Sequence, residues 1–399
     1  MKILMLTPVP THPPIAGNRA RILALADALV AGGHTLHLAW VALEDGDRDA
    51  MAAHFGAGFS ELRYRAPAAV SGLAARARRR VLRSLKQPSA YVWGVDDWYD
   101  PALTPQLAAL YRRHRFDAVF VEYVFLSRAL EAFPDTVIRV IDTHDRFADR
   151  HLHYLKAGKR PQWFSTTPAD ESAGLARADV VLAIQDNEAR QFAQALQGRA
   201  RVTTVGHLLD LAQSVLPADA PRAVFVASAN EINVDAANTF ITGVLPRVRA
   251  AIAGFELLLA GDVCNGALDA AGVRKLGRVD SIANAYAQGA LAVNPVRMGT
   301  GLNIKTMECL ALGMPLVATA SGSRGLECLR GQAFLTVADS DAAGMAAQIV
   351  RLLRDARLRH ALSHQALAAA RAWNVAQLTN LSQVLQAPPL PAQCGVRRL

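Results

Sequence analysis

The segment NPVRMGTGLNIKTMECLALGMPLVATASGSRGL, residues 294–326, contains the pattern that decides the fold. It continues a short apolar run, and its opening loop contains Gly299 and Gly301. Apolar residues then recur with helical spacing over 304–312, and a second short apolar run occupies 316–319. A strand, a loop, a helix and another strand in this order predict one unit of a parallel α/β sheet.

The same alternation continues on both sides of this segment. Short, mainly apolar runs, typical of strands buried in a parallel sheet, lie at 3–6, 36–41, 118–121, 137–141 and 180–184, and again at 223–227, 255–260 and 290–293. A further strand is predicted at 273–276, where the alternation continues. Helical patterns separate many of them, at 20–31, 103–113, 235–253 and 282–288. We therefore predict two doubly wound α/β domains, residues 1–210 and 211–375, followed by a helix and a tail at 376–399.

Composition limits the partners and the compartment. A formal net charge of +9 and a sequence pI near 9.7 favour anionic partners, such as nucleotide phosphates, acidic lipid head groups or nucleic acid. The four cysteines form no CxxC pair and no zinc-like spacing, so we expect lone thiols in a reducing compartment. The N-terminal MKILMLTPVP is interpreted as a first strand, and no run of about 18 apolar residues occurs. We therefore expect a cytoplasmic protein without a metal site.

The loop and helix at 294–312 combine residues that suit an anionic ligand. Gly299 and Gly301 allow backbone N–H groups to approach an anion before the helix begins, and the helix dipole favours negative charge there. Lys305 in the first turn and Glu308 three residues later could bind a phosphate and a ribose hydroxyl pair. The alternative is a surface Lys–Glu pair beside a tight turn, and the pattern taken alone favours that simpler interpretation.

This stretch resembles the donor-site signature of GT4-like glycosyltransferases (glycosyl transferases group 1), approximately P-x-R-x-G-x-G-x-x-x-K-x-x-E-x-x-A-x-G-x-P-x-V-x-T. The matching residues are Pro295, Arg297, Gly299, Gly301, Lys305, Glu308, Ala311, Gly313, Pro315, Val317 and Thr319. Weaker similarity covers most of residues 1–375, including 121–126, 142–150 and 175–192 in the first half and 223–240, 257–262 and 277–296 in the second.

The resemblance implies the GT-B fold, in which two Rossmann-like domains face a cleft. The N-terminal domain would bind the acceptor, the C-terminal domain would bind the nucleotide sugar, and the last helix would return to the N-terminal domain. The family further implies a retaining transfer with no obligatory metal and no other cofactor. Its acceptors are commonly lipid-linked or surface glycans, which would place a cytoplasmic enzyme at the inner face of a membrane.

The motif also assigns roles to residues of the C-terminal half. Glu308 would accept hydrogen bonds from the ribose hydroxyls, while Lys305 and the backbone at 299–301 would bind the diphosphate. Arg278 and Val279 would flank the base. In the family, an Arg or Lys often follows the first strand of this domain, but here NEIN at 230–233 takes its place. Neutralisation of the diphosphate would therefore depend on Lys305 and on Arg297.

Thr300 marks the second departure from the family pattern. Many GT4 enzymes have a glutamate here, eight positions before Glu308, where it faces the donor sugar. Thr300 remains a donor-side candidate, with hydroxyl and backbone groups taking the place of the missing carboxylate. The identity of the sugar therefore stays open.

Candidates in the N-terminal half follow two strands. His144 corresponds to a region in which the family has a histidine that contacts the transferred sugar; the alternative is a structural histidine. Asp145 could be an acceptor-side base or a helix cap. His12, Gly17 and Asn18 lie on the first strand-to-helix loop, where a doubly wound sheet opens to ligands.

A basic amphipathic helix is predicted over 73–86, LAARARRRVLRSLK. Leu73, Ala77, Val81 and Leu85 recur every four residues, while the arginines and Lys86 gather elsewhere on the helix. Such a helix could lie on an anionic membrane surface, or its basic face could be solvated while the helix packs on its own domain. No aromatic interleaving or nucleic-acid-binding motif is present, so we expect no nucleic-acid partner.

Together these observations predict a retaining, nucleotide-sugar-dependent glycosyltransferase. Two alternatives stay open: a catalytically silent GT-B partner subunit that binds nucleotide, and a nucleotide-sugar epimerase. The missing glutamate at Thr300 keeps the silent subunit open, and the retained Lys305 and Glu308 argue against it. An epimerase would need carboxylates near the anomeric carbon, and the sequence shows no clear set.

Overall fold

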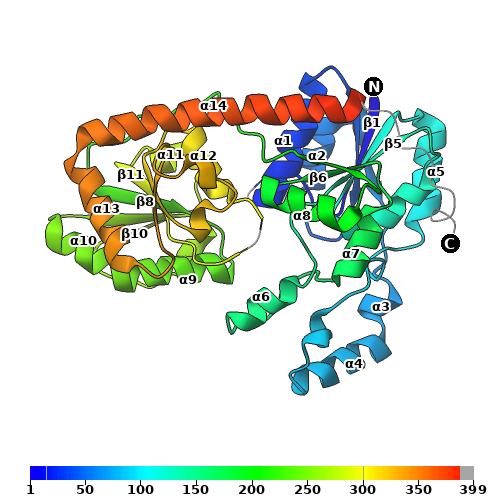
Figure 1. Ribbon diagram of the computed structural model, residues 1–399, viewed down its shortest axis with the longest axis horizontal. Helices are drawn as coiled ribbons and strands as arrows, with labels where there is room; N and C mark the ends of the chain where they lie inside the picture. Colours follow the sequence, from blue (N-terminus) through cyan, green and yellow to red (C-terminus); the bar gives the residue numbers. More distant parts are fainter. Residues whose placement is uncertain (15, 300, 387–399) are drawn as a thin grey trace. The chain divides into compact units, whose positions relative to one another are not determined.

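The computed structural model describes residues 1–14, 16–299 and 301–386. Within these residues the chain divides into two compact units (Figure 1). Unit 1 contains residues 1–206 together with those from 377 onward, and unit 2 contains residues 207–376. The donor-side candidate Thr300 and the expected tail, residues 387–399 with Cys394, lie outside the described residues.

Unit 1 is built on a seven-stranded parallel sheet in the order β3-β2-β1-β4-β5-β6-β7. The strands are β1 (Lys2–Thr7), β2 (Thr35–Val41), β3 (Phe59–Leu62), β4 (Ala118–Glu122), β5 (Ile138–Asp142), β6 (Val180–Ala183) and β7 (Arg201–Thr204). The helices are α1 (Gly17–Ala31), α2 (Arg48–Phe55), α3 (Ala68–Ser71), α4 (Leu73–Ser84), α5 (Leu103–His114), α6 (Arg150–Lys156), α7 (Pro168–Leu175) and α8 (Asp186–Leu196), with a 3-10 helix at Val124–Ala132.

Unit 2 repeats the plan with a six-stranded parallel sheet in the order β10-β9-β8-β11-β12-β13. The strands are β8 (Arg222–Val226), β9 (Glu256–Ala260), β10 (Val273–Gly277), β11 (Leu291–Asn294), β12 (Leu316–Thr319) and β13 (Leu335–Val337). The helices are α9 (Glu231–Thr239), α10 (Leu245–Ala251), α11 (Ile282–Tyr286), α12 (Ile304–Ala311) and α13 (Ala342–Arg354), with a π-helical turn at Phe240–Val244 between α9 and α10. Helix α14 (Ala356–Gln386) begins in unit 2 and belongs to unit 1 from Gln377 onward.

Each apolar run that the sequence singles out as a strand is a strand in the structure. The central strands are buried on both faces, as the mainly apolar sequences of β1, β4 and β5 predict. In each unit the strand order reverses beside the first strand, between β1 and β4 and between β8 and β11. Ligands of doubly wound folds bind at the carboxyl ends of the strands at such a point, so the topology indicates where each unit would hold a ligand.

The helix predicted over 235–253 begins earlier than the apolar pattern indicates. It starts at Glu231, because the side chain of Asn230 caps it by accepting a hydrogen bond from the backbone N–H of Asn233 at 2.9 Å. It then passes through the π-helical turn before α10. The sequence NEIN at 230–233 therefore forms the cap and first turn of α9.

Residues 373–380 of α14 are hydrogen-bonded to residues 204–209, at and after the end of β7. In unit 2, Trp373 Nε1 donates to the carbonyl oxygen of His207 at 2.8 Å, and the side-chain amide of Asn374 bonds both backbone groups of Leu209. In unit 1, Gln377 Oε1 accepts from the N–H of Gly206, and Asn380 Nδ2 donates to the carbonyl oxygen of Thr204. The side-chain amides of α14 thus form hydrogen bonds with backbone N–H and C=O groups at and after the end of β7.

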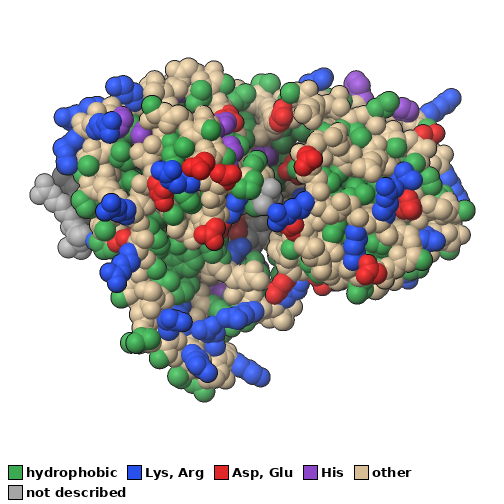
Figure 2. All heavy atoms as spheres, turned by 180° about the vertical axis from the view of Figure 1, so that it is seen from behind, with side chains coloured by type: hydrophobic (Ala, Val, Ile, Leu, Met, Phe, Trp, Pro, Cys, Tyr) green, Lys and Arg blue, Asp and Glu red, His purple; other side chains and the backbone are tan. Residues whose placement is uncertain are grey.

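Helices α3 and α4 project from unit 1, and Lys and Arg side chains gather on this projection (Figures 1 and 2). The apolar positions Leu73, Val81 and Leu85 are 84%, 56% and 62% exposed. This apolar stripe is therefore largely exposed, while α4 contacts unit 1 through Arg79, which donates to the carbonyl oxygens of Ala90 and Val92. Among the described residues, no helix is both long enough and apolar enough to span a bilayer.

Candidate functional site

The glycine loop of unit 2 lies between β11 and α12, at the carboxyl edge of the sheet. Gly299 has φ of 140° and Gly301 has φ of 71°, conformations that residues with a Cβ rarely adopt. A Cβ on Gly299 would also lie 3.0 Å from the guanidinium of Arg324. The two glycines therefore allow the loop to turn over this arginine, which agrees with the sequence prediction of a loop shaped for a close backbone approach.

The side chain of Asn294 joins this loop to the next one. Asn294 ends β11, and its Nδ2 lies within hydrogen-bonding distance of Asn303 Oδ1 (2.8 Å), Thr306 Oγ1 (3.0 Å) and the carbonyl oxygen of Gly322 (3.0 Å). Thr306 donates to the same carbonyl at 2.6 Å. These buried bonds fix the start of α12 against the loop after β12. The signal that could have revealed Asn294 is its place as a polar residue at the end of an apolar strand.

Lys305 and Glu308 lie in α12 and are both half-buried. Burial is the main cause of the raised pKa of Glu308, about 7, and of the lowered pKa of Lys305; the attraction between the two charges opposes both shifts. Neither side chain makes a hydrogen bond to another residue in the part of the chain that the structure describes. A desolvated cation and carboxylate are thus available to a ligand.

Arg324, in the loop after β12, brings a second cation to the same place. Its Nε donates to the carbonyl oxygen of Gly301 at 2.8 Å, and repulsion from its charge is one of the causes that lower the pKa of Lys305. Two cations near one helix N-terminus suit a polyanion. Arg324 lies in the decisive segment, but the motif does not predict a role for it, because it lies 19 residues after Lys305 and beyond the last motif position.

The remaining donor-side candidates lie at the same edge of the sheet. Arg278 and Val279 follow β10; Arg278 is exposed and donates two hydrogen bonds to Asp262, at 2.7 and 3.1 Å. Arg297 is paired with Asp235 of α9 at 2.9 Å. The charge of Arg297 is therefore already balanced, and Arg324 rather than Arg297 is the guanidinium that lies against the glycine loop.

At the corresponding edge of unit 1, four ionisable side chains form a buried cluster. Glu122 ends β4, Asp142 ends β5, and His144 follows two residues later. Arg21 of α1 donates to both carboxylate oxygens of Asp142, at 2.9 and 2.6 Å, and to the carbonyl oxygen of Val205. The ligand atoms of the two carboxylates and the histidine lie within 4.8 Å of one another, but Asp142 is already occupied by this guanidinium. The cation of the cluster is thus Arg21.

His144 is fixed within this cluster from two sides. Its Nε2 lies 2.5 Å from Glu122 Oε2, and its ring stacks on that of Tyr123 with 4.1 Å between centroids. Burial lowers the pKa of His144 to about 4 and is the main cause that raises the pKa of Glu122 well above its ordinary value, with repulsion from Asp142 adding to it. Sequence reasoning found His144 but missed Arg21 and Glu122.

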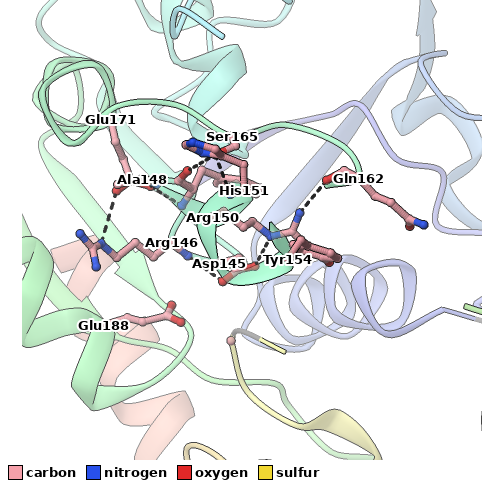
Figure 3. Close-up of polar contacts among 12 residues, drawn as sticks. Asp145, Arg146, Ala148, Arg150, His151, Tyr154, Gln162, Ser165, Glu171 and Glu188 are labelled. Carbon is pink, nitrogen blue, oxygen red and sulfur yellow. Dashed lines mark hydrogen bonds and ion pairs between the residues drawn. The ribbon is translucent and has the colours of Figure 1, made fainter. Parts of the chain in front are cut away.

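The segment after His144 is held by ion pairs and backbone contacts (Figure 3). Asp145 Oδ2 accepts from Arg150 Nε at 3.0 Å, and Arg150 also donates to the carbonyl oxygen of Gln162. Glu171 accepts hydrogen bonds from the backbone N–H groups of Phe147 and Ala148. The alternative that made Asp145 a helix cap is wrong, because α6 begins at Arg150 and the residue before it is Asp149.

The other acceptor-side candidates lie before and within the first turn of α1. His12 Nδ1 lies 2.9 Å from Thr11 Oγ1, and its ring lies against His54. Gly17 and Asn18 are the first two residues of α1, so they begin the helix that also carries Arg21. The structure thus places the expected residues at the carboxyl edge of the sheet and adds the buried arginine.

Comparison with known proteins agrees with this geometry. Residues 220–355 match the family model described as glycosyl transferases group 1. No curated protein sequence matches the chain at a significant level.

Solved structures match over nearly the whole chain. Sucrose-phosphate synthase from Thermosynechococcus elongatus has a TM-score of 0.68 at 16% identity, over 96% of this chain and 98% of that one. HepE of Anabaena in complex with UDP has a TM-score of 0.65 at 14% identity, over 97% of this chain and 100% of that one. The pneumococcal O-GlcNAc transferase GtfA in complex with UDP and GlcNAc has a TM-score of 0.63 at 10% identity, over 97% of this chain and 98% of that one. The predicted kinship with the glycosyl transferases group 1 is therefore confirmed over residues 220–355, in a chain that has the GT-B fold.

Proposed function

We propose that this protein is a glycosyltransferase that uses a nucleotide-sugar donor. The observation that carries the proposal is the start of α12, where Lys305 and Glu308 are half-buried, make no hydrogen bond to a described residue and lie near Arg324. Two cations and a carboxylate suit a nucleoside diphosphate, which has anionic phosphates and a ribose with hydroxyl donors. All three residues lie in the segment that matches the family model.

The proposed roles follow from this chemistry. Glu308 accepts hydrogen bonds from the ribose hydroxyls, while Lys305, Arg324 and the loop amides bind the diphosphate; Arg278 and Val279 flank the base. Negative charge develops on the diphosphate as the sugar leaves, and the same cations stabilise it. We propose accordingly that transfer needs no obligatory metal, and that it retains the anomeric configuration.

The first donor to test is a UDP-sugar, because the structures of HepE and GtfA contain UDP; GDP- and dTDP-sugars remain candidates. We propose a lipid-linked or surface glycan as acceptor and assign His144 to the transferred sugar. His12, Gly17 and Asn18 are the proposed acceptor-side residues. Asp145 could serve as a base only after its ion pair with Arg150 opens.

Thermal unfolding with UDP, GDP, dTDP and ADP tests the nucleotide site. A ligand that binds only the folded state stabilises it by about 2.7 kcal/mol at a hundredfold excess over its dissociation constant. We expect one nucleotide to raise the unfolding midpoint, and Glu308→Ala to abolish the rise. Glu61→Ala, an exposed glutamate of unit 1, is the matched control and should leave the rise unchanged.

Turnover by the isolated protein tests the reaction. Release of free nucleotide from the nucleotide sugar, and NMR of the anomeric proton in the product, would show transfer and its stereochemistry. Nucleotide binding without turnover on any acceptor would favour the silent partner subunit. Conversion of one nucleotide sugar into another would instead identify an epimerase.

We also propose that α4 binds an anionic membrane surface. Residues 62–95 contain eight Lys or Arg and no Asp or Glu. Leu73, Val81 and Leu85 are exposed on this helix, while Arg79 is held against the ring of Trp93, with its guanidinium carbon 3.1 Å from the ring centroid. Exposed apolar side chains among unopposed cations suit acidic head groups above an acyl layer. An enzyme bound to the membrane surface through α4 would have access to a lipid-linked acceptor.

Flotation with vesicles tests the membrane surface. We expect the protein to float with phosphatidylglycerol vesicles at low salt and not with pure phosphatidylcholine. Because each basic residue contributes about 1 kcal/mol at such a surface, Arg78→Gln with Arg80→Gln should weaken binding roughly thirtyfold. The control, Arg112→Gln with Arg113→Gln on α5, changes charge equally and should have little effect. Absence of wild-type binding at low salt would remove the proposal.

A further inference from the structure

We propose that Glu122 and His144 share one buried proton, and that Glu122 is the positioning residue that fixes the tautomer of His144. In this arrangement the carboxyl group of Glu122 donates to Nε2, so the neutral imidazole has its proton on Nδ1. The consequence for turnover rests on the proposed function, whereas the tautomer itself does not.

The geometry of the pair leaves room for a single proton. Glu122 Oε2 and His144 Nε2 are 2.5 Å apart, and their side chains are 0% and 5% exposed. The other oxygen, Glu122 Oε1, is buried and has no hydrogen-bond partner among the described residues. An ionised carboxylate would leave that oxygen charged and unsolvated, whereas a neutral carboxyl leaves a weaker acceptor there.

The charges around the pair are already balanced without it. Arg21 and Asp142 form a two-point ion pair, and Asp142 Oδ2 lies 3.6 Å from His144 Nε2. The groups that face the histidine are thus Glu122 of β4, Asp142 of β5, Arg21 of α1 and the ring of Tyr123. Ionising Glu122 and His144 as well would place two more charges in a site that is almost fully buried. Burial shifts the pKa values of both groups toward their neutral forms.

The backbone of the pair's surroundings is strained. Tyr123 directly follows β4, and His144 lies two residues after the end of β5. Both have a positive φ, 71° for Tyr123 and 57° for His144. Residues other than glycine rarely adopt such angles, and they persist where surrounding contacts enforce them. Their rings stack with 12° between planes, which fixes the plane of the imidazole. The strained backbone at Tyr123 and His144 thus accompanies a single orientation of the imidazole ring.

This orientation defines what His144 can do. With Nε2 bound to Glu122, the remaining polar atom is Nδ1, which makes no hydrogen bond within the described residues. An Nδ1–H group is a donor, and its natural partner is a hydroxyl or ring oxygen of a sugar. His144 would therefore act as a hydrogen-bond donor rather than as a general base. Without the proton from Glu122, the imidazole could exchange between its two tautomers and lose this function.

Nitrogen NMR of the full chain with ¹⁵N-labelled histidine tests the tautomer. The chain has eleven histidines, so the signals of His144 are identified by their loss in His144→Asn. We expect a neutral Nδ1–H tautomer that does not titrate between about pH 5.5 and 8.5. Glu122→Gln should retain it, because the amide N–H donates to Nε2; Glu122→Met should yield a tautomer mixture. An imidazolium or an Nε2–H tautomer at neutral pH in the wild type would overturn the proposal.

Two controls separate this from a general loss of structure. Glu171→Gln changes another buried carboxyl of unit 1 and should leave the His144 signals unchanged. In turnover, Glu122→Gln should retain kcat, whereas Glu122→Met should lower it about tenfold or more, as expected for one lost hydrogen bond to substrate. The nucleotide-induced thermal shift should stay the same in both. If the wild type shows no turnover, the proposed function fails, while the NMR spectra still decide the tautomer.

Discussion

Replacing Glu171 by glutamine should remove a pH dependence from the stability of unit 1. The side chain of Glu171 is 6% exposed and accepts hydrogen bonds from the backbone N–H groups of Phe147 and Ala148 (Figure 3). Arg146 Nε is 3.9 Å away. Glutamine has the same size and offers its Oε1 to the same N–H groups, but it cannot ionise.

The sign and size of the effect follow from the pKa of Glu171. Burial raises it from 4.5 to about 7, against the opposing effect of the two backbone hydrogen bonds and of Arg146. Between these values the folded state keeps a proton that the unfolded state has released, so the free energy of unfolding falls as pH rises from about 4.5 to 7. At 1.36 kcal/mol per pKa unit the loss is about 3 kcal/mol. The loss is complete above the folded pKa.

Urea unfolding monitored by tryptophan fluorescence measures this effect. Four of the five tryptophans, Trp40, Trp93, Trp98 and Trp163, belong to unit 1, so the signal reports mainly on that unit. We expect Glu171→Gln and the wild type to be similar near pH 4.5, and the variant to be more stable at pH 8 by up to about 3 kcal/mol. The control Glu61→Gln should follow the wild type. Parallel pH profiles of Glu171→Gln and wild type would refute the reasoning.

Three further changes test unit 2. Lys305→Ala should leave the unfolding midpoint unchanged but abolish the nucleotide-induced shift and most turnover; near-normal activity of the folded variant would contradict its role. Arg324→Met should weaken binding of the nucleoside diphosphate about tenfold or more, as loss of a charge-assisted hydrogen bond implies, without affecting the nucleoside in calorimetric titrations. Equal losses for both ligands would show that the loop has moved instead. Asn294→Leu should lower the free energy of unfolding by about 1–3 kcal/mol, since it removes the hydrogen bond to Asn303 Oδ1 and leaves Thr306 as the donor to the carbonyl oxygen of Gly322; an unchanged midpoint would argue against it.

The strands that sequence reasoning missed all lie at the edges of the two sheets, and β10 is the edge strand that it found. The buried strands β1, β4 and β5 are mainly apolar, because helices cover both faces of a central parallel strand. The strands missed are β3, β7 and β13, each at the edge of its sheet and only partly buried. An edge strand has an open side, so its sequence lacks the continuous apolar run that would reveal it.

The site shows the same division between local and distant information. Lys305 and Glu308 lie three residues apart on one helix, so a motif can bring them together. The pair of Arg21 and Asp142 spans 121 positions, and an arginine in a helix of mixed composition is ordinarily interpreted as exposed. Only the parallel pairing of β1 with β4 and β4 with β5 reveals that these groups meet.

The division of the chain has a consequence for its synthesis on the ribosome. Unit 2 is continuous in sequence, so all of its residues have been made before residue 377 is added. Unit 1 begins first, but Gln377 and Asn380 supply hydrogen bonds to Gly206 and Thr204 at its end. Because domains fold largely as their residues emerge, the unit whose translation starts first is completed last. The hydrogen bonds of Gly206 and Thr204 with α14 therefore form only after all of unit 2 has been synthesised.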